Sequence, residues 1–215
     1  MASIKLKHSG GNGVIIAAPS SNPASDRTIT LPSTADGTML TTTNPKAGNI
    51  IQVKHVYKGN RFVTTSTSYT DITDLSISIT PSSSSNVIIF TCHMGQAGTK
   101  QSNLDHGQAI RVLRDIGGAG FSDDNKLNGQ SDGNRDRISF KGLGWAYNDD
   151  HMAGGVGFSG VDDPNTTSAV TYKVQVSAQD SNHPFVLNGT YNDTNGGGTY
   201  NGRSFTSIIA MEVAQ

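Results

Sequence analysis

The sequence contains few of the residues that build helices and disulfide frameworks. Its 215 residues include one cysteine, Cys92, one glutamate, Glu212, and only nine leucines. A single cysteine excludes an intrachain disulfide framework. The scarcity of Glu and Leu, both good helix formers, excludes a helical bundle and argues against a Rossmann-like α/β fold. Hydrophobic residues make up 34% and charged residues 15%, both low for a globular domain.

Features of membrane and nucleic-acid-binding proteins are also missing. No apolar stretch approaches the roughly 20 residues that span a bilayer, and the first residues lack the apolar region of a signal peptide. No basic run carries interleaved aromatic residues, so we expect no nucleic-acid partner. We expect a protein that is made in the cytoplasm of a cell and does not insert into membranes.

Small polar residues and glycine make up much of the remaining composition. The chain has 24 serines, 22 threonines, 17 asparagines and 25 glycines, which favour strands, turns and loops. A chain of this length can bury about 70% of its unfolded surface, so it needs no metal or disulfide to fold. The composition therefore predicts an all-β, loop-rich protein.

The first 48 residues alternate weakly between apolar and polar side chains. Four short strands are expected there, at 4–7, 14–17, 28–32 and 38–41, separated by turns such as Asp36-Gly37. Because these strands supply almost no core, the segment needs partners, most simply copies of itself. Ile4 and Leu6 are therefore candidate trimer-interface residues, and the alternative is a flexible tail. We expect residues 1–48 to form a stem, with a linker over Thr43–Asn49 at its junction with the rest of the chain.

Residues 49–215 show stronger alternation and are expected to form one head domain. Eight or so strands with long loops fit an antiparallel sandwich or jelly roll. The predicted strands are Ile50–Tyr57, Leu75–Ile79, Val87–Met94, Gln108–Arg114, Arg137–Tyr147, a short strand around Val156–Phe158, Ser168–Gln179, Phe185–Leu187 and Ser204–Ala214.

The last of these strands is apolar on both faces. Ile208 and Ala210 lie on one face, and Ile209 and Met211 lie on the other. Such a strand is either central in its sheet or buried between subunits. The absence of charge between Arg203 and Glu212 favours the second interpretation, with Ile208 and Ala210 at a trimer interface.

Motifs for catalysis and cofactor binding fail their structural requirements. Gly155–Gly160 matches a dinucleotide-binding pattern but lacks the strand before it and the helix after it. Cys92 lies mid-strand in an apolar run, typical of a buried thiol. The pairs Asp123-Asp124, Asp149-Asp150 and Asp162-Asp163 fit solvated turns better than calcium ligands. We expect no enzymatic activity, no cofactor and no metal.

Several short segments, taken together, match one known class of protein. They are Ser3–His8, Asn22–Asp26, Thr30–Pro32, Asp36-Gly37 with Leu40, Gly48–Val53, Thr67–Ile72, Ile77–Pro81, Ser84–Val87 and Ser207–Val213. In these segments the chain resembles fibre-type virion proteins of marine tailed bacteriophages. The resemblance implies a jelly-roll head similar to C1q/TNF-like trimeric domains, on a trimeric β-rich stem.

This resemblance implies a structural, non-enzymatic role in the virion. We expect a homotrimeric tail fibre or adhesin that contacts other virion proteins and binds a host surface, with a glycan as one candidate receptor. A capsid decoration or head fibre of similar build is the alternative within virions, and a free carbohydrate-binding module is the alternative from another class.

Two loops combine aromatic rings with asparagine and aspartate, the side chains that recognise sugars. We expect receptor binding there rather than on the sheets, although Trp145 and Tyr147 could instead finish a core strand, with the glycine-rich loop a mere connection. The candidates are Tyr191, Asn192, Asp193 and Tyr200 in one loop, and Trp145, Tyr147, Asn148 and Asp149 in the other.

Overall fold

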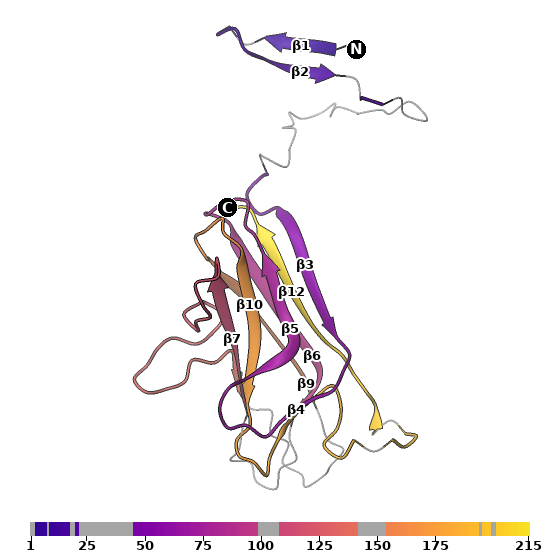
Figure 1. Cartoon of the computed structure of the whole chain (residues 1–215). Helices are drawn as coiled ribbons and strands as arrows, with labels where there is room; N and C mark the ends of the chain where they lie inside the picture. The colour runs from indigo at the N-terminus through magenta and orange to yellow at the C-terminus, as the bar shows by residue number, and fades with distance from the viewer. Residues whose placement is uncertain are drawn as a thin grey trace. The chain divides into compact units, whose positions relative to one another are not determined.

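The computed structural model describes residues 3–7, 9–17, 20–21, 45–98, 108–141, 154–193, 195–198 and 201–215. The chain divides into two compact units, Met1–Met39 and Leu40–Gln215 (Figure 1). Gly48 donates a backbone hydrogen bond to Ala214 at 2.8 Å, and Ala214 donates one to Asn49 at 3.0 Å. The end of the predicted linker is thus bonded to the larger unit. A boundary at residues 48 and 49 stays a prediction.

The smaller unit contains an antiparallel hairpin of β1 (Ser3–Lys7) and β2 (Gly13–Ala17). This confirms the first two predicted strands, and those at 28–32 and 38–41 lie outside the described residues. Leu6, Ile15 and Ile16 are each more than half exposed, at 60%, 55% and 54%. A two-stranded hairpin is marginally stable alone, and this one leaves its apolar side chains in solvent.

The larger unit is an antiparallel sandwich, which confirms the all-β, jelly-roll-like fold. Its small sheet has the order β5-β10-β7-β8, and its large sheet has the order β3-β12-β6-β11-β4 with β9 paired to β6. The strands are β3 (Ile50–Lys58), β4 (Phe62–Thr64), β5 (Thr70–Ile79), β6 (Val87–Gly98), β7 (Ala109–Ile116), β8 (Phe140–Lys141), β9 (Gly154–Asp162), β10 (Val170–Ser177), β11 (Phe185–Leu187) and β12 (Thr206–Val213).

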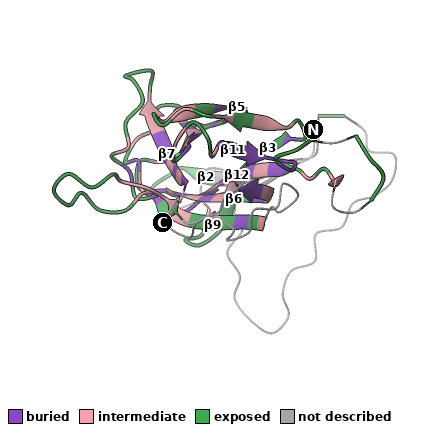
Figure 2. Ribbon diagram, turned by 90° about the horizontal axis from the view of Figure 1, so that it is seen from below, coloured by how far each residue is buried: buried purple, intermediate pink, exposed green. Residues whose placement is uncertain are grey.

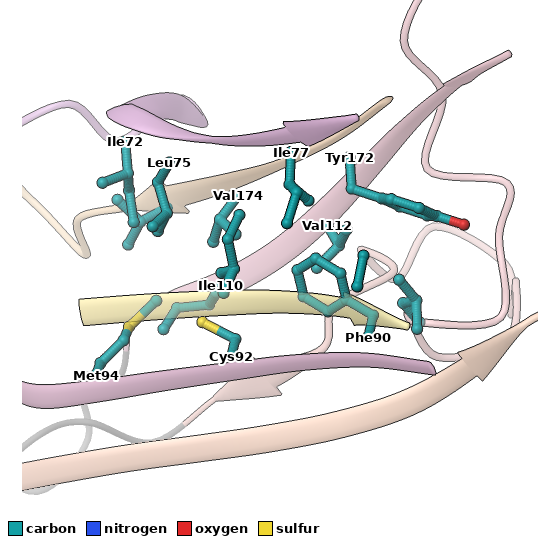
Figure 3. Packing of buried hydrophobic residues seen from close by; sticks show 14 of the residues in the cluster. Ile72, Leu75, Ile77, Phe90, Cys92, Met94, Ile110, Val112, Tyr172 and Val174 are labelled. Atoms are coloured by element: carbon teal, nitrogen blue, oxygen red, sulfur yellow. The ribbon is translucent and has the colours of Figure 1, made fainter. Parts of the chain in front are cut away.

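The core lies between these two sheets. Figure 2 shows buried residues between β5 and β7 on one side and β6 and β12 on the other. Alternate residues of β5 and β10 point inward over Leu75–Ile79 and Val170–Val174, as predicted from the alternation there. The rings of Phe90 and Tyr172 meet across the core with centroids 5.6 Å apart, and Cys92 and Met94 continue the inner row of β6 (Figure 3). Each such large side chain stabilises the fold by about 1.5–3 kcal/mol on burial.

Three strands differ from the sequence prediction. β9 runs over nine residues where a short strand around Val156–Phe158 was expected. Its glycines contribute no apolar signal, so its alternation is faint in the sequence. β4 was not predicted at all. Of the strand expected over Arg137–Tyr147, the structure shows the two-residue β8, and residues 142–147 lie outside the described part of the chain.

The two ends of the sandwich can be told apart by where the chain enters it. The proximal end is where the chain joins the head at Gly48, beside the end of β12. The distal end is the opposite one, where β3 ends and β12 begins, since Lys58 pairs with Thr206. β5 and β7 also begin at the distal end and β10 ends there. Val176 pairs with both Thr70 and Ile110, so these three strand ends coincide. Lys58 at the distal end of β3 donates a hydrogen bond to Thr73 near the start of β5, which places them at the distal end.

One buried carboxylate connects the two sheets. Asp162 on β9 is fully buried, and both of its oxygens accept hydrogen bonds from Arg114 Nη1 at 2.9 Å. The Tyr172 hydroxyl donates to it at 2.8 Å and the Lys126 backbone N–H at 3.2 Å. Since Arg114 and Tyr172 belong to the small sheet, this cluster fixes the sheets relative to each other. Burial and the Asp162 carboxylate raise the pKa of Tyr172, so its hydroxyl stays a donor.

The only glutamate of the chain closes the proximal end. Glu212 Oε1 accepts hydrogen bonds from the Ser82 backbone N–H at 2.6 Å and from Asn86 Nδ2 at 2.6 Å. Its Oε2 accepts one from Gln52 Nε2 at 2.6 Å. Burial alone would raise the pKa of Glu212, but these hydrogen bonds outweigh burial and hold its pKa below the ordinary value. The carboxylate thereby joins β12 to β3 and to the turn after β5.

Candidate functional site

The outer face of the large sheet carries no charged carboxylate, ammonium or guanidinium group across four adjacent strands. The strand register places the outward residues in rows, because β3, β12, β6 and β9 are paired side by side. We call this surface the apolar face. Its residues are Val53, His55 and Tyr57 on β3, Ser207, Ile209 and Met211 on β12, Ile89, Thr91 and His93 on β6, and Gly157, Ser159 and Val161 on β9.

Large side chains of the apolar face are exposed to solvent. Val53 is 55% exposed, Tyr57 61% and Val161 50%. Phe205, at the distal end of the same face, is 44% exposed and stacks on Tyr57 with ring centroids 5.5 Å apart. The imidazole ring of His93 lies against the Phe205 ring, with ring centroids 5.9 Å apart. The exposed apolar side chains thus form two groups, Val53 and Val161 in the row shared with Met211 and Ile89, and Tyr57 with Phe205 at the distal end. Exposed apolar groups of this size mark interaction surfaces more often than isolated apolar side chains do.

The outer face of the small sheet is the opposite in character. Asp71 accepts hydrogen bonds from Lys173 Nζ at 2.9 Å and from Gln175 Nε2 at 2.6 Å. Gln175 Oε1 in turn accepts one from Arg111 Nε at 2.9 Å. This face carries paired charges typical of a solvent-facing sheet. The contrast makes the apolar face the less polar of the two outer surfaces of the sandwich.

The residues predicted at a trimer interface on the last strand lie on the wrong face for that role. Ile208 and Ala210 are fully buried in the chain's own core, because β12 is central in the large sheet. The outward residues of β12 are Ile209 and Met211, which belong to the apolar face. The alternative interpretation of this strand, central in its sheet, is therefore the correct one for Ile208 and Ala210. Leu6 is exposed, and only the backbone pairing of Ile4 with Ile16 is described.

The loop that follows β11 is held firmly at the distal end. Asn188 is fully buried, and its Nδ2 donates to the carbonyls of Lys58 at 2.8 Å and Asn60 at 3.1 Å. Its Oδ1 accepts a hydrogen bond from the Thr206 hydroxyl at 2.8 Å. The φ of Asn188 is 59°, a left-handed conformation that asparagine tolerates better than most residues. These hydrogen bonds therefore hold the first residue of the loop in place at the end of β11.

Two arginines support the tip of this loop. Arg61 Nη2 donates to the carbonyls of Thr190 and Tyr191, both at 3.1 Å. Asp193 pairs with the guanidinium of Arg203 and lies 3.6 Å from Arg61 Nη1. The Tyr191 side chain is 36% exposed at this tip. Sequence reasoning missed both arginines: Arg61 lies 130 residues from Tyr191 along the chain, and Arg203 lies just past the end of the predicted loop.

The structure brings together three of the eight predicted receptor residues. Tyr191, Asn192 and Asp193 are consecutive on the distal loop, with Asn192 exposed and Asp193 engaged by arginines. The other five predicted residues lie outside the described part of the chain: Trp145, Tyr147, Asn148, Asp149 and Tyr200. Their receptor role stays a prediction.

Several features considered for catalysis and metal binding lie in the described residues, whereas the pair Asp149-Asp150 lies outside them. Burial raises the pKa of the Cys92 thiol to about 12, as expected of a core cysteine. Gly155–Gly160 lies within β9, so no helix N-terminus follows it to hold a phosphate. Asp123 and Asp163 are paired with Arg111 and Lys126. Within the described residues, no three His, Cys, Asp or Glu side chains gather in a way that suits a metal ion.

Comparison with known proteins adds no family. No protein-family model matches the sequence, and no curated protein matches it either. Among the described residues, no helix has the length and apolar character needed to cross a membrane.

Proposed function

We propose that this chain is a structural virion protein of a tailed phage, a homotrimeric fibre whose head binds the host surface. In this proposal residues 1–48 form the stem that attaches to other virion proteins, and residues 49–215 form the outward head. The observation that carries the proposal is the apolar face, because a monomer would leave it in water. The virion assignment and the number three rest on the resemblance of the sequence motifs to marine phage fibre proteins.

A second copy of the chain is the occupant that best suits the apolar face. Burying exposed apolar surface gains about 25 cal/mol per Å². Val53, Tyr57 and Val161 are all at least half exposed, so each would contribute to an interface. The apolar face also runs along the strands from the proximal to the distal end, which suits packing around an axis parallel to them. Leu6 and Ile15 of the β1–β2 hairpin are also exposed, and burial against another copy of the chain would remove them from water.

The chain path suits a head that presents its distal end to a receptor. The stem joins at the proximal end, so the distal loop after β11 points away from the attachment point of the head. Tyr191 offers an aromatic ring there and Asn192 an amide, held on a backbone that Asn188 and Arg61 fix. Preorganised loops lose less entropy on binding than flexible ones.

Light scattering on charge variants tests the oligomer. Val53→Lys adds a charge at a side chain that is 55% exposed in the single chain, so the fold tolerates it while an interface would not. Ser78→Lys on the exposed outer face of the small sheet is the matched control. We expect a mass about three times 22.6 kDa for the wild type and Ser78→Lys, and dissociation for Val53→Lys. A monomeric wild type at micromolar concentration contradicts the proposal.

A virion reconstruction tests the rest of the function. We expect density for the trimer on the tail, with residues 1–48 at the attachment point, and loss of the protein from virions when 1–48 is deleted. Density on the capsid would replace the adhesin by a head fibre or decoration. Absence of the chain from virions would refute the proposal. Substituting Tyr191 and Tyr200 together with Ala is expected to reduce adsorption to host cells while the trimer still assembles.

A further inference from the structure

A cavity of about 550 Å³ opens at the distal end of the small sheet, and none of its lining residues belongs to the apolar face or to the loop after β11. It forms where β5 and β7 begin, β10 ends and the edge strand β8 pairs with β7. Its size falls within the 300–1,000 Å³ typical of small-molecule sites. The lining residues are Thr67, Tyr69, Ala109, Asn134, Arg135, Asp136, Ile138, Lys141, Ser177, Ala178 and Gln179.

The aromatic ring of Tyr69 is fixed in the wall of this cavity. Its hydroxyl donates a hydrogen bond to Asp136 Oδ2 at 3.2 Å, and the Arg111 guanidinium carbon lies 3.9 Å from the ring centroid. Arg111 does not line the cavity, so it supports the ring from behind while the ring borders the open space. Burial and the Asp136 carboxylate raise the pKa of Tyr69 to about 12, so the phenol stays neutral. A rigid ring of this kind suits stacking against the C–H face of a sugar.

The polar groups around the ring match a sugar that carries a carboxylate. Asn134 and Gln179 offer amides that can both donate to and accept from hydroxyl groups. Arg135 and Lys141 place two cations at the cavity against the single carboxylate of Asp136. Arg135 pairs with Asp132, whereas Lys141 is exposed and has no ion pair with any described residue. Lys141 is therefore the group left to bind an anion.

We propose that this cavity binds an acidic sugar unit of a surface glycan, with Tyr69 as the stacking platform and Lys141 as the carboxylate ligand. The site differs from the loops in which the sequence predicts receptor binding. Its biological meaning rests on the proposed function, since the distal end is taken as the end that meets the host. The binding itself is a property of the isolated protein and can be measured without virions.

Saturation-transfer NMR on the full chain tests the site with two probes, methyl glucuronide and its neutral counterpart methyl glucoside. Single sugars bind weakly, so titrations extend to about 20 mM. We expect the glucuronide to bind and the glucoside to bind several-fold more weakly. Loss of a charge-assisted hydrogen bond in Lys141→Ala is expected to weaken glucuronide binding about tenfold or more. Lys46→Ala removes the same charge from an exposed site near the proximal end and is expected to leave binding unchanged.

A second pair of variants separates the ring from its hydroxyl. Tyr69→Phe keeps the platform and is expected to retain binding, whereas Tyr69→Leu keeps apolar bulk without a flat ring and is expected to lose it. No binding of either probe overturns the inference. Equal affinity for both probes, or equal losses in Lys141→Ala and Lys46→Ala, overturns the assignment of an acidic sugar to Lys141.

Light scattering on the same samples separates this inference from the proposed function. A trimer that binds neither sugar refutes the cavity as a glycan site and leaves the fibre proposal standing. A monomer that binds glucuronide through Lys141 supports the site and refutes the trimeric fibre.

Discussion

The buried carboxylate of Asp162 offers the sharpest test of what holds the sandwich together. Asp162 lies on β9 of the large sheet and accepts hydrogen bonds from both Arg114 and Tyr172 of the small sheet. Asp162→Asn keeps the shape of the side chain but removes its charge. It also turns an amide N–H₂ toward groups that are themselves donors.

The expected cost follows from the number of donors that lose their acceptor. Arg114 uses Nη1 on both carboxylate oxygens, and its side chain is only 18% exposed, so water replaces the lost charge poorly. Breaking a buried ion pair by removing one partner costs about 3–5 kcal/mol in the free energy of unfolding. Tyr172→Phe removes one hydrogen bond and leaves the ion pair intact, so it is expected to cost about 0.5–1.5 kcal/mol.

Urea denaturation followed by circular dichroism measures both variants, at one fixed protein concentration because assembly adds to apparent stability. The double variant Arg114→Met/Asp162→Asn is expected to be no less stable than Asp162→Asn, since it removes the uncompensated charge. If Asp162→Asn loses no more stability than Tyr172→Phe, the reasoning is wrong. Arg114 would then find enough compensation in its hydrogen bond to the Asp124 carbonyl, now 2.8 Å long.

Two further predictions concern the ends of the head. Because the pKa of Glu212 is lowered in the folded state, its stabilising effect is present above the unfolded pKa of about 4.3 and is lost as pH falls through the folded pKa. Urea midpoints below pH 5 should therefore fall more steeply for the wild type than for Glu212→Gln, and parallel profiles would contradict this. Asn188→Ala is expected to cost about 2–3 kcal/mol of unfolding free energy through lost buried hydrogen bonds. Asn188→Gly, which relieves the left-handed backbone, should cost about 1 kcal/mol less; equal losses would show that φ contributes nothing.

Strands with clear alternation could be predicted from the sequence. The side of a strand that faces the core could be predicted only where the other side carries polar residues. Val170, Tyr172, Val174 and Val176 face inward as expected, because polar residues separate them. On β12 both sets of residues are apolar at the centre, so alternation alone does not say which set faces the core. The inner set of β12 also includes the polar residues Thr206 and Glu212, and both are buried because each has its own hydrogen-bond partners.

The cavity at the distal end could not be predicted from the sequence. Tyr69, Asp136 and Gln179 come from three separate segments, and the pairing of β5 with β10, β10 with β7 and β7 with β8 brings these segments together. Their residue types are common in loops, so none of them stands out alone. The loop after β11 could be proposed from the sequence, since Tyr191, Asn192 and Asp193 are consecutive, and its receptor role stays a prediction.

If the chain is the fibre proposed above, the pairing of β3 with β12 has a mechanical consequence. The chain reaches β3 at Gly48, and β3 runs antiparallel to β12 along the whole length from Thr206 to Val213. A pull between Gly48 and a ligand at the distal end acts along these strands. The hydrogen bonds between them are then loaded in shear and must break together rather than one after another. The strand that transmits the tension is thus clamped to the centre of the large sheet, and the head should resist extension while its ligand dissociates first.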